Sequence, residues 1–212
     1  MIGDLSVREF GERLASAQPT PGGGSVAALT GALGAGLVSM VCNFTVGREK
    51  YADVEEEMQA LLRRSEELRL QLEQAVEDDV AAYGGYSEAS KLPRSTDEEQ
   101  RAREAALEVA LRESTLVPLG VAERCAALLE LALRAAELGN RFLISDAAVG
   151  AELAAAARAS AELNVRLNVG GIDDPTFASG VRSRLEAVRA RVGDARELVD
   201  RAVAVVEERA GG

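Results

Sequence analysis

The stretch QPTPGGGSVAALTGALGAGLVSMVCNF, from Gln18 to Phe44, decides the fold. It begins with two prolines and a triplet of glycines. From Gly22 to Phe44 it contains no charged residue, although 28% of the chain is charged. The stretch is long enough to span a membrane, but its glycines and hydroxyl side chains make it weakly apolar on insertion scales. We therefore predict a helix of small residues, about Gly23 to Val46, buried on all sides at the centre of a helical bundle.

The beginning of this helix is more informative than its middle. Pro19 and Pro21 disfavour helix before them, and the triplet Gly22–Gly24 permits backbone angles that are closed to other residues. Ser25 can cap the first turn. Backbone N–H groups exposed at such a helix end form a cradle for an anion or oxyanion. A tight turn that only caps the helix is the equal alternative.

The composition excludes several functional classes. At 212 residues the chain is long enough for one helical domain, residues 1–212. The net charge of −11 argues against nucleic-acid partners and anionic membrane surfaces. The chain has no histidine and only two cysteines, which excludes Ser-His-Asp and Cys-His chemistry and argues against a protein-built metal site. The N-terminus shows no signal-peptide pattern, so we expect a cytoplasmic protein with reduced thiols.

The remaining sequence is dominated by Ala, Leu, Glu and Arg, which favour helix. It predicts an all-α bundle of about six long, mostly antiparallel helices around the central small-residue helix. We expect Pro118 to kink or divide the fourth of these helices. The predicted helices span about residues 6–17, 23–46, 53–90, 97–138, 141–165 and 177–210.

One acid lies where the helical pattern calls for apolar residues. Asp79 falls on the seam of the third predicted helix, after Leu72 and Ala75. An acid in a core is costly unless it is paired or protonated, so Asp79 is either a buried salt-bridge partner or a group for proton transfer. Neighbouring Asp78 lies off the seam and is expected in solvent. Tyr83, one turn after Asp79, either stacks on a ligand ring or belongs to the core.

A second acid interrupts the fifth predicted helix. Asp146 lies in a row of mostly apolar residues from Phe142 to Leu163, which we take as the buried seam of that helix. Asp146 is therefore a second candidate for catalysis, or it caps a helix that begins slightly later. Asn140, Asn164 and Asn168 lie nearby in the sequence and could line a polar pocket.

The short turn between the second and third helices makes them antiparallel. Equal counting from that turn places Gly22–Ser25 opposite about Gln74–Asp79, so the glycine turn and the acid should be neighbours. Lys50 and Lys91, the only lysines among 24 basic residues, stand at opposite ends of the third helix. That helix is roughly 55 Å long at 1.5 Å per residue, so the two lysines cannot share a site in one chain. We predict an antiparallel homodimer that brings the Lys50 end of one copy to the Asp79 end of the other; two ordinary surface lysines are the alternative.

Several stretches resemble the cyclodeaminase/cyclohydrolase family of folate one-carbon enzymes, and they cover about Gln18 to Val169. They are PTPGGGSVAAL, MVCNFTVGREKY, DDVAAYGGYSEASKLPR, and GNRFLISDAAVGAEL with AELNVRLNV. The resemblance implies an all-helical dimer that acts on a tetrahydrofolate derivative as substrate, and we expect no tightly bound cofactor. Asp79 matches the family's acid four positions before an aromatic residue, here Tyr83. The neighbouring Asp78 leaves open which of the two acts.

The site residues that follow from the pattern and the resemblance form two sets. The candidate catalytic residues are Asp79 and Asp146. The candidate folate-binding residues are Pro21, Gly22, Gly23, Gly24, Ser25, Lys50, Tyr83, Lys91, Asn140 and Asn164.

The first hypothesis is a formiminotetrahydrofolate cyclodeaminase in which one acid both takes and gives a proton. The alternatives are a methenyltetrahydrofolate cyclohydrolase, in which the same acid activates water, and a non-catalytic helical dimer that binds folate or serves as a scaffold.

Overall fold

The computed structural model describes residues 2–193 and 195–210, and the regular elements of that part are all helices. Two short 3₁₀ helices, Ile2–Asp4 and Glu49–Val54, accompany the α-helices. The α-helices are α1 (Val7–Leu14), α2 (Gly23–Asn43), α3 (Glu55–Ser90), α4 (Asp97–Leu138), α5 (Ile144–Val169), α6 (Pro175–Val192) and α7 (Ala195–Ala210).

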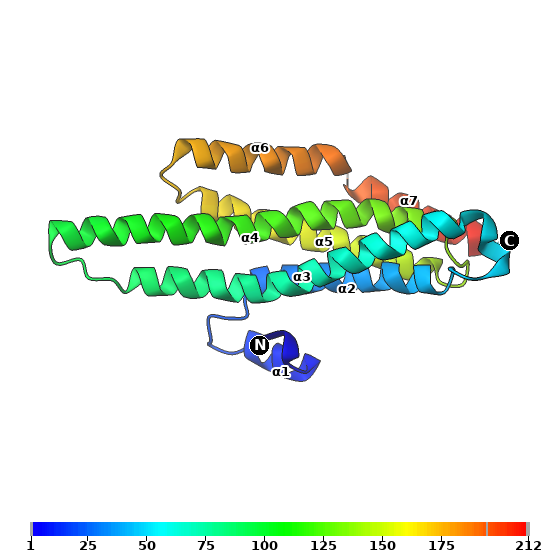
Figure 1. Ribbon diagram of the computed structural model, residues 1–212, viewed down its shortest axis with the longest axis horizontal. Coiled ribbons are helices and arrows are strands. Elements are labelled where there is room, and N and C mark those ends of the chain that lie inside the picture. The colour runs from blue at the N-terminus through cyan, green and yellow to red at the C-terminus, as the bar shows by residue number, and fades with distance from the viewer. Residues whose placement is uncertain (1, 194, 211–212) are drawn as a thin grey trace.

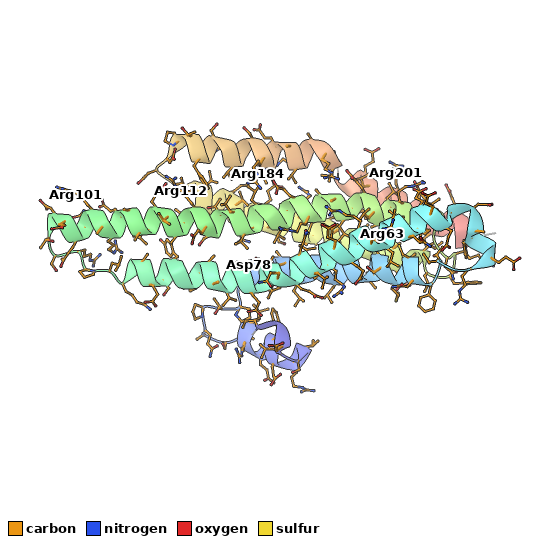
Figure 2. The ribbon with its side chains drawn as sticks, viewed as in Figure 1. Arg63, Asp78, Arg101, Arg112, Arg184 and Arg201 are labelled. Atoms are coloured by element: carbon orange, nitrogen blue, oxygen red, sulfur yellow. The ribbon has the colours of Figure 1, made fainter. Side chains whose placement is uncertain are left out.

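Helices α2 to α5 form the bundle. Each packs against the next in the chain, and α5 closes the ring by packing against α2. Helix α7 packs against α4 and α5, and α6 lies along α4 (Figure 1). Charged side chains such as Arg63, Arg101 and Arg184 project from the outside of the bundle (Figure 2). The prediction of an all-α bundle with long antiparallel helices is confirmed.

Helices α3 and α4 are much longer than α2 and α5. Their shared hairpin therefore extends past the N-terminus of α2 as a two-helix arm, residues 79–118 (Figure 1). The predicted apolar seam of α3 is buried from Met58 through Leu72 to Ala75, where α2 covers it. Asp79 follows one turn later, where α2 begins, so it lies at the edge of the core and is partly exposed.

Small residues bring α2 and α5 into close contact. A Cβ built on Gly34 would lie 3.0 Å from the carbonyl oxygen of Gly150, and one built on Gly150 would lie 3.1 Å from that of Gly34. Helix α2 is long and apolar enough to cross a membrane by length and composition. In the structure, however, most of it packs against α3, α4 and α5.

The prediction that α2 is buried on all sides is wrong. Most of its alanines and glycines face inward, and Gly34 allows the backbone of α5 to approach closely. Val38 and Val41 are also buried, but Leu33 is 59% exposed.

The same inversion corrects the predicted seam of α5. Phe142, Val149 and Leu163 in the row that contains Asp146 are exposed, and the buried row is made of alanines such as Ala151 and Ala154. Where the two helices meet at Gly34 and Gly150, side-chain size, rather than hydrophobicity alone, selects the inward face.

The continuity of two predicted helices also differs from the structure. The last predicted helix is broken at Gly193, which adopts φ +55°, so α6 and α7 are separate helices. Pro118 does not divide α4, which continues through it. Proline cannot donate to the carbonyl four residues earlier, and the side-chain amide of Asn168 donates to that carbonyl, Ser114 O, at 2.9 Å.

Candidate active site

The N-terminus of α2 meets α3 at Asp79. Ser25 Oγ donates a hydrogen bond to Asp79 Oδ2 at 2.7 Å, and the Ser25 side chain is fully buried. A Cβ built on Gly24 would lie 2.0 Å from Asp79 Oδ1, so no other residue fits there without moving the carboxylate. The predicted pairing of the glycine turn with the acid is confirmed.

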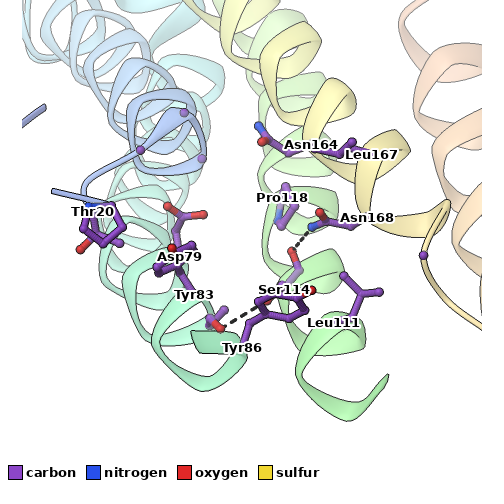
Figure 3. A pocket seen from close by; sticks show the side chains of 16 residues that line it. Thr20, Asp79, Tyr83, Tyr86, Leu111, Ser114, Pro118, Asn164, Leu167 and Asn168 are labelled. Carbon is purple, nitrogen blue, oxygen red and sulfur yellow. Dashed lines mark hydrogen bonds between the residues drawn. The ribbon is translucent and has the colours of Figure 1, made fainter. Parts of the chain in front are cut away.

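An open cavity of about 540 Å³ begins at this contact and extends along the inner side of the arm. Figure 3 shows its walls, with Asp79 and Tyr83 of α3 facing Asn164 and Asn168 of α5. Three segments besides these helices complete the lining. The lining residues are Pro19, Thr20, Gly22, Gly23 and Gly24 before and at the start of α2, Asp79, Ala82, Tyr83 and Tyr86 of α3, Leu111, Ser114 and Pro118 of α4, Asn164, Leu167 and Asn168 of α5, and Gly171.

Asp79 is the charged side chain of this lining. No ion pair among the described residues includes it, so the salt-bridge alternative is wrong. Asp79 Oδ1 has no hydrogen-bond partner among the described residues, whereas Oδ2 accepts from Ser25. Neighbouring Asp78 is exposed and accepts a hydrogen bond from Gln74 Nε2 at 3.0 Å. Of the two acids, therefore, Asp79 lines the cavity and Asp78 does not.

The wall beside Asp79 is aromatic. Tyr83 and Tyr86 follow it on the same face of α3, and both are partly exposed towards the cavity. The alternative that Tyr83 belongs to the core is wrong, because α2 begins beside Asp79 and does not extend over the turn that carries Tyr83. Partly exposed tyrosines offer a flat apolar surface together with a polar hydroxyl, so this wall suits a planar heterocycle.

The opposite wall is formed by amides. Asn168 donates to Ser114 O and Asn164 Nδ2 donates to Ser160 O at 3.1 Å. Their Oδ1 atoms have no partner among the described residues. Both side chains are thus oriented by their own donors and present acceptor oxygens that can bind N–H groups of a ligand.

The lining contains no lysine or arginine. A ligand with an anionic part therefore has to find its cation outside these residues. The backbone N–H groups at the start of α2 offer partial positive charge, but a full counter-charge has to come from beyond this lining.

Several predicted residues do not reach the cavity. Pro21 and Ser25 are buried behind it rather than part of its lining. Lys91 lies at the tip of the arm and pairs with Glu88 at 2.6 Å. These three positions support or flank the site without facing it.

Lys50, Asn140 and Asp146 lie at the other end of α2, about 30 Å away for a helix of this length. There Asn140 Nδ2 donates to Phe44 O at 3.2 Å, and the Tyr51 hydroxyl donates to Asn140 Oδ1 at 3.4 Å. Lys50 Nζ lies 5.8 Å from the centre of the Tyr51 ring. Within one chain, this cluster and the Asp79 cavity are separate.

The prediction from sequence missed Ser114, Leu111 and Pro118 on α4. A proline with Ser114 four residues before it was a usable signal, because the carbonyl of that serine loses its helical donor. The prediction required knowing that α5 lies opposite this turn, which the pattern of α5 did not reveal.

Both cysteines are unsuited to chemistry at this site. Burial raises the pKa of the Cys42 and Cys125 thiols to about 12, so both stay protonated near neutral pH. In the described part of the chain, no group of three or more acidic, Cys or His side chains is arranged to hold a metal ion.

Comparison with known proteins gives a consistent result for most of the chain. The family model described as Formiminotransferase-cyclodeaminase matches residues 6–187. A methenyltetrahydrofolate cyclohydrolase from Methylorubrum extorquens is 44% identical over 199 residues, which cover 94% of this chain and 96% of that protein.

Two further similarities come from a longer protein and from a solved structure. The formimidoyltransferase-cyclodeaminase of Sus scrofa is 36% identical over 86% of this chain, which spans 33% of that protein. The crystal structure of a formiminotetrahydrofolate cyclodeaminase from Thermotoga maritima superposes with a TM-score of 0.84 at 32% identity. The match covers 98% of both chains.

Proposed function

The chain belongs to the formiminotransferase-cyclodeaminase family of folate one-carbon enzymes. On that premise we propose that it is a formiminotetrahydrofolate cyclodeaminase with Asp79 as its acid–base residue. The observation that carries the proposal is the Asp79 carboxylate, which is held by Ser25 at the edge of the core and faces a cavity with an aromatic and an amide wall.

The reaction requires one proton to be moved. N10 of the protonated formimino substrate attacks the formimino carbon, and Asp79 takes the proton from N10. Asp79 then gives this proton to the exocyclic nitrogen, whose bond to carbon breaks as ammonia leaves. The positive charge stays on the new N5–C–N10 bridge. A positioned carboxylate that acts in both directions is worth about 10²–10⁴-fold in rate.

The two walls orient the substrate for this step. Tyr83 and Tyr86 stack against the pterin, and the Oδ1 atoms of Asn164 and Asn168 accept hydrogen bonds from its N–H groups. The N–H groups at Gly22–Gly24 lie close to the carboxylate, where they favour negative charge. The protein holds no tightly bound cofactor in this proposal, since the substrate itself carries the reacting carbon.

A second candidate is methenyltetrahydrofolate cyclohydrolase, which the relative at 44% identity over nearly the full chain favours. In that reaction water attacks the bridge carbon and Asp79 takes one of its protons. The bond from this carbon to N5 breaks, so that N5 gains one proton and the other goes to solvent. The same cavity serves both reactions, because the reacting carbon lies between N5 and N10 in each.

Absorbance of the methenyl bridge separates the two reactions. Purified protein is given 5-formiminotetrahydrofolate in one assay and 5,10-methenyltetrahydrofolate in the other. A cyclodeaminase makes the absorbance appear with release of ammonia, and a cyclohydrolase makes it disappear faster than in buffer. No change in either assay, with folate binding retained by calorimetry, would point to a non-catalytic binding protein.

A homodimer is part of the proposal, and the outward face of α2 and α5 supports it. We define this face by its exposed large apolar residues, which are Leu33, Phe44, Phe142, Val149 and Leu163, with Leu167 at its border with the cavity. A run of such residues is unusual on a monomer surface. A second copy packed antiparallel covers the face, since a twofold axis pairs the same patch on both subunits.

This arrangement supplies the cation that the cavity lacks. An antiparallel partner brings its Lys50 end to the Asp79 end, where the glutamate tail of the folate leaves the cavity. Two observations support this: the outward face extends along α5 from Phe142 to Leu163, and Lys50 follows the C-terminal end of α2.

Sedimentation tests the dimer. Leu163→Glu places a charge in the outward face outside the cavity lining, and we expect it to yield monomers with little activity. Val203→Glu on α7 is the matched control, and we expect it to stay dimeric. A wild-type protein that sediments as an active monomer would refute the dimer.

Lys50 is tested by mixing variants. Lys50→Ala should raise the KM for a polyglutamylated substrate. At low substrate, mixed dimers of Lys50→Ala and Asp79→Asn should regain activity, because one of their two sites has both native residues. If mixing restores nothing, or if the KM is unchanged, Lys50 does not bind the tail.

The cellular setting is proposed on composition. The net charge of −11 is unfavourable for nucleic acid and for anionic membranes, and the two buried thiols suit the reducing cytoplasm. We therefore expect a cytoplasmic enzyme whose partners are its small-molecule substrate and a second copy of itself.

A further inference from the structure

Ser25 stands out because it is a site residue that the substrate cannot touch. Its side chain is fully buried and it is not part of the cavity lining. Its hydroxyl nevertheless donates at 2.7 Å to the one charged side chain of that lining, Asp79. The bond joins the first turn of α2 to α3, two elements that are 54 residues apart in sequence.

We propose that Ser25 is the positioning residue of Asp79 and that it assigns different tasks to the two carboxylate oxygens. The inference rests on the proposed function. Oδ2 is occupied by the Ser25 hydroxyl, which donates to it while the carboxylate is charged. Oδ1 has no partner among the described residues and is therefore the oxygen that takes the proton from the substrate and returns it.

Gly24 restrains the Asp79 carboxylate sterically. Oδ1 lies only 2.0 Å from the position of a Cβ on Gly24, so the carboxylate is pressed against the bare backbone of α2. Rotation of the carboxylate about its own axis would break the Ser25 bond, and displacement towards α2 would meet the Gly24 backbone. The side chain is thereby held in one orientation, as a proton-transfer group requires.

The test compares two buried serines on the same pair of helices. Ser25→Ala removes the hydrogen bond to Asp79. Ser39→Ala is the matched control, because Ser39 is also buried and its hydroxyl shares a 2.8 Å hydrogen bond with Ser65 of α3, far from the cavity. Both variants lose one buried hydrogen bond between α2 and α3, so both should lower the melting temperature to a similar extent.

The kinetic constants distinguish positioning from support. Loss of a hydrogen bond to a charged group corresponds to about 10–100-fold, and we expect Ser25→Ala to lower kcat by that factor with little change in KM. Ser39→Ala should leave kcat unchanged. Ser25→Thr keeps the hydroxyl and should recover most of the rate. If Ser25→Thr does not fold, Ser25→Cys is used instead. Its thiol is a weak donor, so this variant should stay slow.

The double variant Ser25→Ala/Asp79→Asn tests whether Ser25 affects kcat through Asp79. If Ser25 acts through Asp79, this variant is no slower than Asp79→Asn alone. Full kcat in Ser25→Ala overturns the positioning role while an inactive Asp79→Asn still supports the proposed function. An equal loss of kcat in Ser39→Ala overturns it as well, since any weakened contact between the helices would then suffice. An active Asp79→Asn refutes the acid–base assignment itself.

Discussion

At its N-terminal end, α2 makes room for a carboxylate, whereas at its C-terminal end polar groups bind one another. Gly24 and Ser25 contact Asp79, whose Oδ1 has no hydrogen-bond partner among the described residues, and both Asp79 and Gly24 line the cavity. At the far end, Thr45 Oγ1 accepts from the backbone N–H of Asn140 at 2.8 Å and donates to Val41 O. Both ends are rich in small and polar residues, but the cavity that an acid lines together with the glycine turn lies at the first.

The difference teaches how to recognise a reactive end in a helical bundle. Buried polar groups are normally paired, and the network around Asn140 satisfies its members within the protein. A network of this kind stabilises the join between α2, α4 and α5. A carboxylate that is oriented on one oxygen and open on the other is suited to exchange protons with a ligand.

The largest effect should come from Asp79→Asn, because it removes the proton acceptor and keeps the shape of the side chain. We expect kcat to fall by about 10²–10⁴-fold with the melting temperature nearly unchanged. Asp78→Asn is the control, since Asp78 is exposed and bonded to Gln74. Steady-state assays of both variants decide between the two acids, and equal losses would contradict the assignment.

A pair of glycine substitutions sharpens the comparison of the two ends. Gly24→Ala places a methyl group on the Asp79 carboxylate and should lower kcat by about 10–100-fold, the range for disturbing a hydrogen-bonded charged group. Gly139→Ala at the far end meets Ala135 O and a Val41 methyl group, both 2.5 Å from the new Cβ. It should cost about 1–3 kcal/mol of unfolding free energy and leave kcat intact.

Denaturant titration measures the unfolding free energy of Gly24→Ala and Gly139→Ala, and steady-state kinetics measure their kcat. If Gly24→Ala loses only stability, or if Gly139→Ala slows turnover in the folded protein, the two ends do not differ in the way proposed.

The sequence was sufficient for most of the fold and for the central contact. The uncharged run, the seam from Met58 to Ala75 and the short turn predicted α2 and α3, their antiparallel direction, and the approach of Gly22–Ser25 to about Gln74–Asp79. These features depend on local periodicity and on a short connection, which restrict the possible structures strongly.

The inward faces of α2 and α5 could not be predicted from hydrophobicity. The rows of Leu33 and of Val149 are more apolar than the alanine rows, yet they face outward. Close packing of the two backbones at Gly34 and Gly150 decides this, and such a pairing depends on both helices at once. The α4 wall of the cavity was missed for the same reason, because Ser114 acquires its role only when Asn168 lies opposite.

The C-terminal end of α2 should respond in stability. Asn140→Ala removes the acceptor used by the Tyr51 hydroxyl and by the backbone N–H of Phe142, and the donor to Phe44 O. We expect a loss of about 1–2 kcal/mol of unfolding free energy. Asn43→Ala is the control at an exposed position next to Phe44, with an expected loss below about 0.5 kcal/mol. Chemical denaturation measures both, and equal values would show that the network does not stabilise this end.

The smallest effect concerns acid pH, which should loosen the cavity end first. The backbone N–H groups of Phe177 and Thr176 hold the pKa of Asp174 below its usual range. The backbone N–H group of Asp173, aided by Arg112, holds the pKa of Glu108 below its usual range. Because these pKa values are lowered in the folded state, their stabilisation is present above the ordinary carboxyl range and is lost as pH falls through the lowered values.

Hydrogen exchange should therefore show that the first turn of α6, next to the Gly171 edge of the cavity, loses protection as pH falls below about 4. The segment around Asn140 should keep its protection longer, since Thr45 and Asn140 do not titrate. Asp174→Asn keeps the helix cap without the charge, so in this variant the protection of the first turn of α6 should depend less on pH. Simultaneous loss at both ends, after correction for the intrinsic pH dependence of exchange, would mean that acid acts on the bundle as a whole and not on the carboxylates at its functional end.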